Sequence, residues 1–252
     1  MPDSATSAAA RMPLFFSKIV GLDPKLHGKL RLDRSGGFGF AASAQFVPIG
    51  LEEFPAAAQD YPILFTADQP AIPIALLGLQ QGGNLFVQSD GSWRPETYIP
   101  AYVRTFPFVF VASTTSDDLF LGMEPDAACL SIDRGEPLFD SEQPTEALNE
   151  AIALTAALRQ NLLAAEELAR MLDEVGLLEP EEAKIDFSAG GSAVVRGLKV
   201  LKRERLDRIN DQTFLEWRRR NWLPAIYAHT ASTGRWLRLM EAAARARPRI
   251  AH

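Results

Sequence analysis

The sequence predicts an α+β fold for its 252 residues, and three observations favour this class. Short apolar runs separated by Pro, Gly, Asp and Ser fill residues 38–133, a pattern typical of strands joined by tight turns. Residues 143–246 are instead dominated by Ala, Leu, Glu and Arg, with apolar side chains at helical spacing. Apolar residues make up 47% of the chain, which is enough for a sizeable core. A strand-rich part followed by a helix-rich part is the pattern of α+β proteins.

Seven apolar runs in the first part have the length of strands. Asp90-Gly91 and Gly82-Gly83-Asn84 are turn signals between them, because glycine accepts positive φ angles. A short helix is expected over 51–61, with Pro55 as its weak point. The seven runs cover residues 38–42, 45–49, 63–65, 72–77, 85–87, 108–111 and 119–122.

A long amphipathic helix is predicted over 144–175, which contains no Pro or Gly after its first residue. Gly176 follows in the role of a C′ glycine that ends the helix. Such a helix exceeds the usual globular length, so a break near Gln160-Asn161 is an alternative. After it we expect a connector with one or two short strands, at 185–187 and 193–195. Two helices should follow, at 205–222 and 225–246.

The expected organisation is one merged domain over residues 14–246, because no flexible linker divides the two parts. Residues 1–13 are interpreted as a disordered lead and 247–252 as a tail. No stretch approaches the roughly 20 apolar residues of a membrane span. The single cysteine, Cys129, excludes an intramolecular disulfide and fits a reducing compartment, so a soluble protein of the cytoplasm is expected.

The charge pattern argues against a protein that coats nucleic acid, because the net charge is −6. Within the chain, residues 140–186 carry 12 Asp/Glu against 3 Lys/Arg, and residues 199–249 carry 13 Lys/Arg against 5 Asp/Glu. We expect solvated helix faces that partly complement one another, with two separate partners as the alternative. Trp217, Trp222 and Trp236 lie among the arginines at helical positions where burial explains them, so nucleic acid is not an expected partner.

No known catalytic or metal-binding pattern occurs in the chain. The histidines form no HxH or HxxxH pair, so neither a metal site nor a cofactor is predicted. A GxSxG elbow is absent, and Cys129 has apolar neighbours that favour a structural thiol. Gly36-Gly37-Phe38-Gly39 lacks the spacing of a phosphate loop and is interpreted as a turn. His229 follows Ile226-Tyr227-Ala228 on a helix, where a packed or capping role is expected.

Aromatic residues and one guanidinium gather in residues 84–108. These side chains could line a ligand or partner pocket, with Arg104 receiving a carboxylate or stacking on a ring. The alternative is a hairpin and turn whose rings pack in the core around an internally paired arginine. The candidate binding residues are Trp93, Tyr98, Tyr102, Arg104 and His229.

The same segments resemble the bacterial SapC-like family. The resemblance rests on Tyr61-Pro62-Ile63-Leu64-Phe65, on residues 84–93 and 98–108, on Leu138-Phe139-Asp140 and on residues 223–232, and it spans about residues 14–240 in order. It implies a role related to a bacterial surface layer or envelope. It also implies, as a partner, a flavoprotein of the tryptophan-halogenase type. No catalytic residue is implied for this chain.

The leading hypothesis is a non-enzymatic binding or accessory protein that holds a protein partner or a small ligand. The rival hypothesis is an enzyme on an unfamiliar scaffold, in which Arg104 anchors an acid and His229 or Tyr102 moves a proton. A self-assembling surface-layer subunit is a third possibility.

Overall fold

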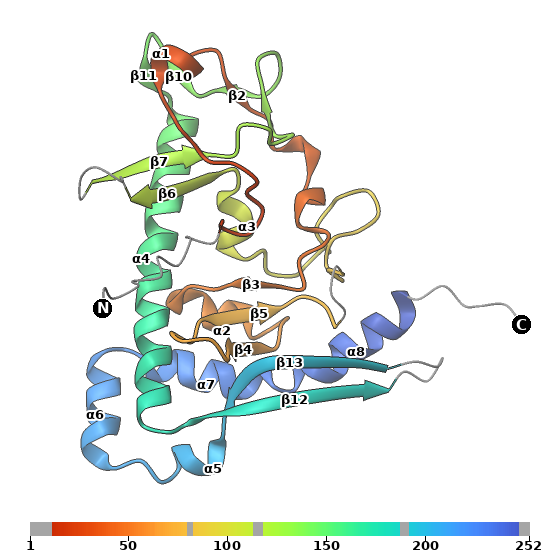
Figure 1. Ribbon diagram of the computed structural model, residues 1–252, viewed down its shortest axis with the longest axis vertical. Coiled ribbons are helices and arrows are strands. Elements are labelled where there is room, and N and C mark those ends of the chain that lie inside the picture. Colours follow the sequence, from red (N-terminus) through yellow and green to blue (C-terminus); the bar gives the residue numbers. More distant parts are fainter. Residues whose placement is uncertain (1–11, 80–82, 113–117, 187–191, 247–252) are drawn as a thin grey trace, which may run out of the picture.

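The computed structural model describes residues 12–79, 83–112, 118–186 and 192–246, and it confirms the α+β class. The helix α4 (Glu146–Glu174) runs along the long axis of the molecule, and two antiparallel sheets lie beside it at different heights (Figure 1). The helices that follow the last strand gather at one end of the long axis. Their bounds are Arg203–Leu206 for α5, Asp211–Arg219 for α6, Leu223–Ser232 for α7 and Arg235–Ala246 for α8.

The larger sheet has five strands in the order β12-β13-β4-β5-β3, and every neighbouring pair is antiparallel. Its inner strands β4 and β5 are buried at every position, which explains why they are continuous apolar runs in the sequence. The strands are β3 (Phe46–Pro48), β4 (Ile63–Thr66), β5 (Pro73–Leu76), β12 (Leu178–Asp186) and β13 (Ser192–Leu201).

The second sheet has the order β1-β7-β6, and β6 packs against α4. Its strands are β1 (Val20–Gly21), β6 (Phe108–Ala112) and β7 (Leu119–Met123). A small sheet of two-residue strands, in the order β8-β2-β9, and the hairpin of β10 and β11 lie at the other end of α4 from the C-terminal helices (Figure 1). These short strands are β2 (Arg31–Leu32), β8 (Leu130–Ser131), β9 (Glu136–Pro137), β10 (Phe139–Asp140) and β11 (Gln143–Pro144).

The helix α4 is unbroken, so the predicted helix is confirmed and the alternative of a break near residue 160 is wrong. Thr145 caps its first turn by accepting from Leu148 N, and Gly176 follows its end with φ of +70°. The two halves of α4 pack into different hydrophobic clusters. Leu148 and Ala151 join Phe108 and Met123, whereas Ala165, Leu168, Ala169 and Leu172 join the larger core of the five-stranded sheet. The helix therefore bridges two cores.

Most predicted strands of the first part are confirmed, and two are wrong. Residues 39–41 form a 3₁₀ turn, η2 (Gly39–Ala41), and residues 85–87 form no strand but contribute one bridge, between Val87 and Trp93. The helix expected over 51–61 ends early, as η3 (Leu51–Glu53) followed by α2 (Phe54–Ala57). Proline is tolerated in a first turn, where no intrahelical N–H bond is lost, and Pro55 occupies that position in α2.

The connector after α4 was predicted with strands that are too short. The structure has a long hairpin there instead, in which β12 and β13 pair from Leu178↔Leu201 to Asp186↔Ser192. The segment of β12 is rich in Glu and contains Pro180, so it lacks the apolar alternation of a typical strand. Because β12 is an edge strand, charged residues and proline are tolerated there and discourage pairing with another chain. The helix-rich part thus contains the two longest strands among the described residues.

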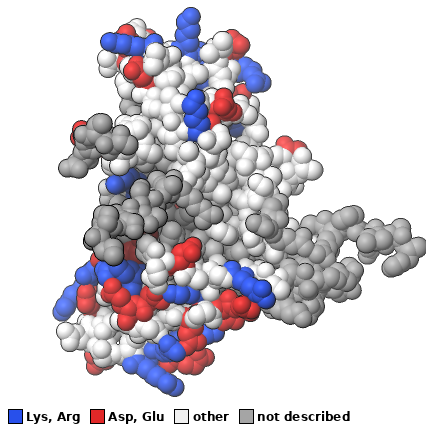
Figure 2. Space-filling model, viewed as in Figure 1, with Lys and Arg blue, Asp and Glu red and all other residues white. Residues whose placement is uncertain are grey.

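The expected charge complementarity is present between the acidic and basic blocks. Ion pairs join Arg220 to Glu167, Lys199 to Asp173, Lys202 to Glu181 and Arg205 to Glu179. Arg196, which lies just before the basic block, pairs with Glu182. On the face shown in Figure 2, charged side chains gather towards the two ends of the long axis and leave the middle largely uncharged. Trp217 and Trp222 are buried, as expected, whereas Trp236 is only partly buried against the same core. The Arg220 guanidinium lies 4.8 Å from the Trp222 ring centroid.

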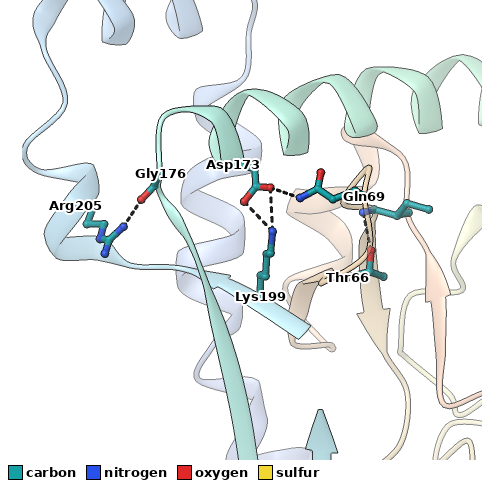
Figure 3. Close-up of polar contacts among 7 residues, drawn as sticks. Thr66, Gln69, Asp173, Gly176, Lys199 and Arg205 are labelled. Atoms are coloured by element: carbon teal, nitrogen blue, oxygen red, sulfur yellow. Dashed lines mark hydrogen bonds and ion pairs between the residues drawn. The ribbon is translucent and has the colours of Figure 1, made fainter. Parts of the chain in front are cut away.

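Asp173 forms the best-enclosed of these pairs, at the last turn of α4 (Figure 3). Both of its carboxylate oxygens accept from Lys199 Nζ at 2.9 Å, and Oδ2 also accepts from Gln69 Nε2 at 2.8 Å. These bonds hold the pKa of Asp173 below its ordinary value. Beside them, Arg205 Nη1 donates to the Gly176 carbonyl at 2.5 Å. The contacts tie the end of α4 to β13 and to the loop between β4 and β5.

Replacing Asp173 with alanine is expected to lower the free energy of unfolding by about 2 kcal/mol, because Lys199, with a side chain only 12% exposed, loses its partner. Urea unfolding at pH 7 measures this. The matched control is Glu174→Ala, which removes an exposed pair with Arg170 and should change the value by less than about 0.5 kcal/mol. Equal effects of the two substitutions would contradict this role of Asp173.

Candidate functional site

A chain of hydrogen bonds runs through the aromatic and arginine segment. Trp93 Nε1 donates to the Tyr61 hydroxyl at 3.2 Å, and that hydroxyl donates to the Tyr98 carbonyl. The Tyr98 hydroxyl in turn donates to Glu53 Oε1 at 2.9 Å and accepts from Arg104 Nη2 at 3.4 Å. The structure therefore brings Trp93, Tyr98 and Arg104 together, in one internal network.

Glu53 is the acceptor at the end of this network, and the sequence analysis did not find it. Its side chain is buried, with the residue 7% exposed, and it also accepts from the backbone N–H groups of Gly50 at 2.8 Å and Ala101 at 2.7 Å. The spacing Gly50-x-x-Glu53 carries a signal that could have found it, because a glutamate at N3 bonds back to the N-cap N–H. Glu53 thereby fixes the start of α3 (Ala101–Thr105) against η3.

Burial dominates the electrostatics of this network. It raises the pKa of Tyr61 strongly, and it raises the pKa of Tyr98 to about 12 with further contributions from the charge and hydrogen bond of Glu53. Both tyrosines are therefore neutral hydroxyls at physiological pH. Arg104 Nε donates to the Ile99 carbonyl at 3.0 Å, so the guanidinium packs back onto its own segment. The polar groups of these side chains thus hold the segment in shape.

Tyr102 instead lines a pocket of about 200 Å³ between α3, β6 and α4, here called the α3–α4 pocket. Its hydroxyl donates to the Leu14 carbonyl at 3.3 Å, and burial raises its pKa to about 12. The walls are mainly apolar and come from rings, aliphatic side chains and two threonines: Phe16, Thr105, Phe108, Val109, Phe110, Thr155, Leu158, Leu162 and Leu163. An apolar cavity with few polar groups is the usual form of a small-ligand site.

The α3–α4 pocket lies where the two cores meet along α4. Thr155, Leu158 and Leu162 line it from the stretch between the residues that pack into one core and those that pack into the other. Arg159 and Glu166 also line it, seven residues apart and therefore on one face of the helix. Burial raises the pKa of Glu166. The pocket thus offers an apolar interior with one cation and one carboxyl group on its wall.

His229 lies in the larger core, against different residues. It is 1% exposed, its Nε2 accepts from Leu201 N at 3.1 Å, and its ring centroid lies 5.1 Å from that of Phe65. Ser232, one turn later, accepts from Ile63 N at 3.0 Å. These bonds attach α7 to β13 and β4. Among the described residues, no hydrogen bond, ion pair or ring contact joins His229 to Arg104, so the structure does not bring these two candidates together.

A cluster of phenylalanines contributes to the walls of both the α3–α4 pocket and a second cavity. Phe40 stacks on Phe106 with centroids 4.2 Å apart, and Phe15 contacts both rings and Tyr102. The neighbouring Phe16 lines the α3–α4 pocket, whereas Phe15 lines the other cavity. Phe15 has a φ of +77°, a left-handed conformation that is rare for a bulky residue.

Comparison with protein families identifies the family of the chain. The sequence model of the SapC family matches residues 22–239, which is most of the chain. The chain belongs to the SapC family. This SapC match includes the network of Glu53, the α3–α4 pocket residues from Tyr102 to Glu166, and His229. No curated protein and no solved structure matches the chain.

Within the described residues, no three or more His, Cys, Asp or Glu side chains gather closely enough to form a metal site. No described helix combines the length and the apolar character that a membrane span requires.

Proposed function

We propose that this SapC-family chain is a binding or accessory protein that holds an apolar group of a small ligand or partner in the α3–α4 pocket. Tyr102 forms part of the wall, and the side chains of Arg159 and Glu166 receive the polar end of the bound group. The observation that carries the proposal is the location of this cavity, which opens where α4 passes between two well-packed cores. Its apolar walls include the exposed Leu163, and a bound apolar group removes this surface from water.

The network of Glu53 supports this proposal by supplying a rigid frame. It holds the first residue of α3 through Ala101 N, so Tyr102 starts from a fixed backbone position. A preformed wall lowers the entropy that binding must offset. In this proposal Trp93, Tyr98 and Arg104 position the pocket, and Tyr102 contacts the ligand. The role of His229 as a binding residue stays a prediction.

The family resemblance supports a wider role related to a bacterial surface layer or envelope, beside a flavoprotein of the tryptophan-halogenase type. The cytoplasm is the proposed location, because the lone Cys129 thiol suits a reducing compartment. Co-purification from the native host at native expression level, with the flavin absorbance of the eluate as readout, tests this partnership. Elution without flavin and without a flavoprotein would remove the halogenase-type partner from the proposal.

The pocket itself is tested with the fluorescent probe 1-anilinonaphthalene-8-sulfonate, whose rings suit the apolar walls and whose sulfonate suits Arg159. We expect Leu162→Trp to weaken probe binding at least tenfold, because the larger side chain fills the cavity. Arg159→Gln should weaken it severalfold. The measurement is a fluorescence titration at fixed ionic strength.

The matched control is Leu215→Trp, which introduces the same side chain at an exposed leucine of α6 that does not line the pocket. It should leave the affinity of the probe unchanged. Equal affinity of wild type and a folded Leu162→Trp variant would overturn the proposed site.

A further inference from the structure

The phenylalanine cluster lines a second cavity of about 500 Å³, here called the glycine-loop pocket. Its walls are formed by Gly36, Gly37 and Gly39 of the glycine turn, by the rings of Phe15, Phe40 and Phe106, and by the segment that follows β7. From that segment come two carboxylates, Glu124 and Asp126, together with Ala127, Ala128 and Cys129. Ser17 completes the wall.

Two residues of the glycine turn have open space around them. A Cβ atom built on Gly36 or on Gly39 would meet nothing within 4 Å, and both residues line the cavity as bare backbone. The turn itself is held rigidly. Gly37 has φ of +71°, a Cβ there would lie 2.5 Å from the Gly91 carbonyl oxygen, and Phe38 N donates to that oxygen at 2.7 Å. Glycine at such positions allows a ligand to approach the backbone closely.

Glu124 gives the pocket a fixed negative charge. The residue is 4% exposed, and Oε2 accepts from Ser17 N at 2.6 Å, from Ser17 Oγ at 2.9 Å and from Lys18 N at 3.1 Å. Burial alone would raise its pKa, but the hydrogen bonds from Ser17, Lys18 and Asp126 hold the pKa below its ordinary value. Glu124 is therefore ionised at neutral pH.

This charge lacks a cationic partner within the described part of the chain. Glu124 forms no ion pair with any Lys or Arg described, although buried carboxylates are normally paired. Arg34, which precedes the glycine turn, donates through Nη1 to the Arg104 carbonyl and does not line the pocket. The exposed Asp126 adds a second negative charge to the same wall.

We infer that the glycine-loop pocket is a binding site for a small organic cation with an aromatic or other flat apolar body. The ammonium group lies near Glu124 and Asp126, where it supplies the missing positive charge. The flat body lies against Phe15, Phe40 and Phe106, whose ring faces attract cations and apolar surface alike. The bare backbone of Gly36 and Gly39 leaves room for it. This site is separate from the α3–α4 pocket and does not rest on the function proposed there.

The test uses benzyltrimethylammonium as the probe, with benzyl alcohol as a neutral analogue and phenylacetate as an anionic one. Isothermal titration calorimetry with the full chain, supported by saturation-transfer NMR, gives the three affinities. We expect the cation to bind at least tenfold more tightly than either analogue. Affinity for phenylacetate equal to that for the cation would overturn the inference.

Substitutions locate the binding. Gly39→Val fills the open space and should lower the affinity for the cation at least tenfold. Gly234→Val, which lies outside the pocket, should leave this affinity unchanged. Glu124→Gln and Asp126→Asn should each weaken it at least threefold. Because Glu124 also holds Ser17 and Lys18, the exposed Asp126 variant keeps the charge test valid if Glu124→Gln fails to fold. Unchanged affinity in folded Gly39→Val would place the cation elsewhere and refute the site.

Discussion

Replacing Glu53 with alanine is expected to lower the free energy of unfolding by about 3–5 kcal/mol, one of the two largest effects that we predict. The substitution leaves two buried backbone N–H groups, those of Gly50 and Ala101, and the Tyr98 hydroxyl without their acceptor. Each buried donor left unpaired costs about 1–3 kcal/mol. Chemical denaturation at pH 7, monitored by tryptophan fluorescence, measures the change.

Two variants make this prediction specific. Glu52→Ala removes the neighbouring exposed glutamate and should change the free energy of unfolding by less than about 0.5 kcal/mol. Tyr98→Phe removes a single hydroxyl from the network and should cost about 1 kcal/mol. A Glu53→Ala variant as stable as Glu52→Ala would show that the network does not hold α3 in place.

The Glu53→Ala substitution also has a spectroscopic consequence. The charge of Glu53 and its hydrogen bond contribute, after burial, to raising the pKa of Tyr98 to about 12. Loss of the carboxylate should therefore lower this pKa towards 10, as followed by ultraviolet titration of the tyrosines in a variant that remains folded.

The second large effect is a loss of stability as the pH falls from 6.5 towards 4. Burial lowers the pKa of His229 to about 4, against a smaller opposing contribution from the backbone of Ile63, whereas an unfolded histidine titrates near 6.5. Between these values the unfolded chain binds more protons than the folded chain, so the stabilisation is fully present above pH 6.5 and is lost as the pH falls. The difference between pH 7 and pH 4.5 should be about 2–3 kcal/mol for this group.

His229→Gln separates this effect from that of other titrating groups. Glutamine keeps a polar acceptor for Leu201 N but does not titrate, so the variant should lose about 2–3 kcal/mol less than wild type over the same pH interval. Urea unfolding of both proteins at pH 7, 6, 5 and 4.5 gives the comparison. Parallel curves for the two proteins would mean that His229 does not control acid stability.

The two pockets differ in the chemistry of their walls. The α3–α4 pocket is built mainly from apolar groups at the junction of two cores, whereas the glycine-loop pocket carries ionised carboxylates on its wall. Higher ionic strength should therefore weaken binding of the cation in the glycine-loop pocket, because Asp126 is exposed to salt. Binding of an apolar group in the α3–α4 pocket should be much less sensitive to ionic strength.

The sequence by itself determined the features that depend on neighbouring residues. Helix α4 was predicted with its C-terminal glycine because periodicity and capping are encoded within a few residues. Strands β4 and β5 were predicted because buried central strands are continuous apolar runs. The resemblance carried by residues 61–65, 84–108 and 223–232 gave the family. The complementary acidic and basic blocks could also be counted directly from the sequence.

Only the tertiary structure decided what those elements bring together. Glu53 contacts Tyr98 and Ala101 across more than 40 residues, and Glu124 contacts Ser17 across 107, so neither role follows from local pattern. In the long hairpin of β12 and β13, strand β12 was missed because its edge position tolerates charge that a sequence pattern assigns to a loop. Both pockets exist because the chain returns from distant points to leave space between packed groups, and the location of such space depends on the whole fold.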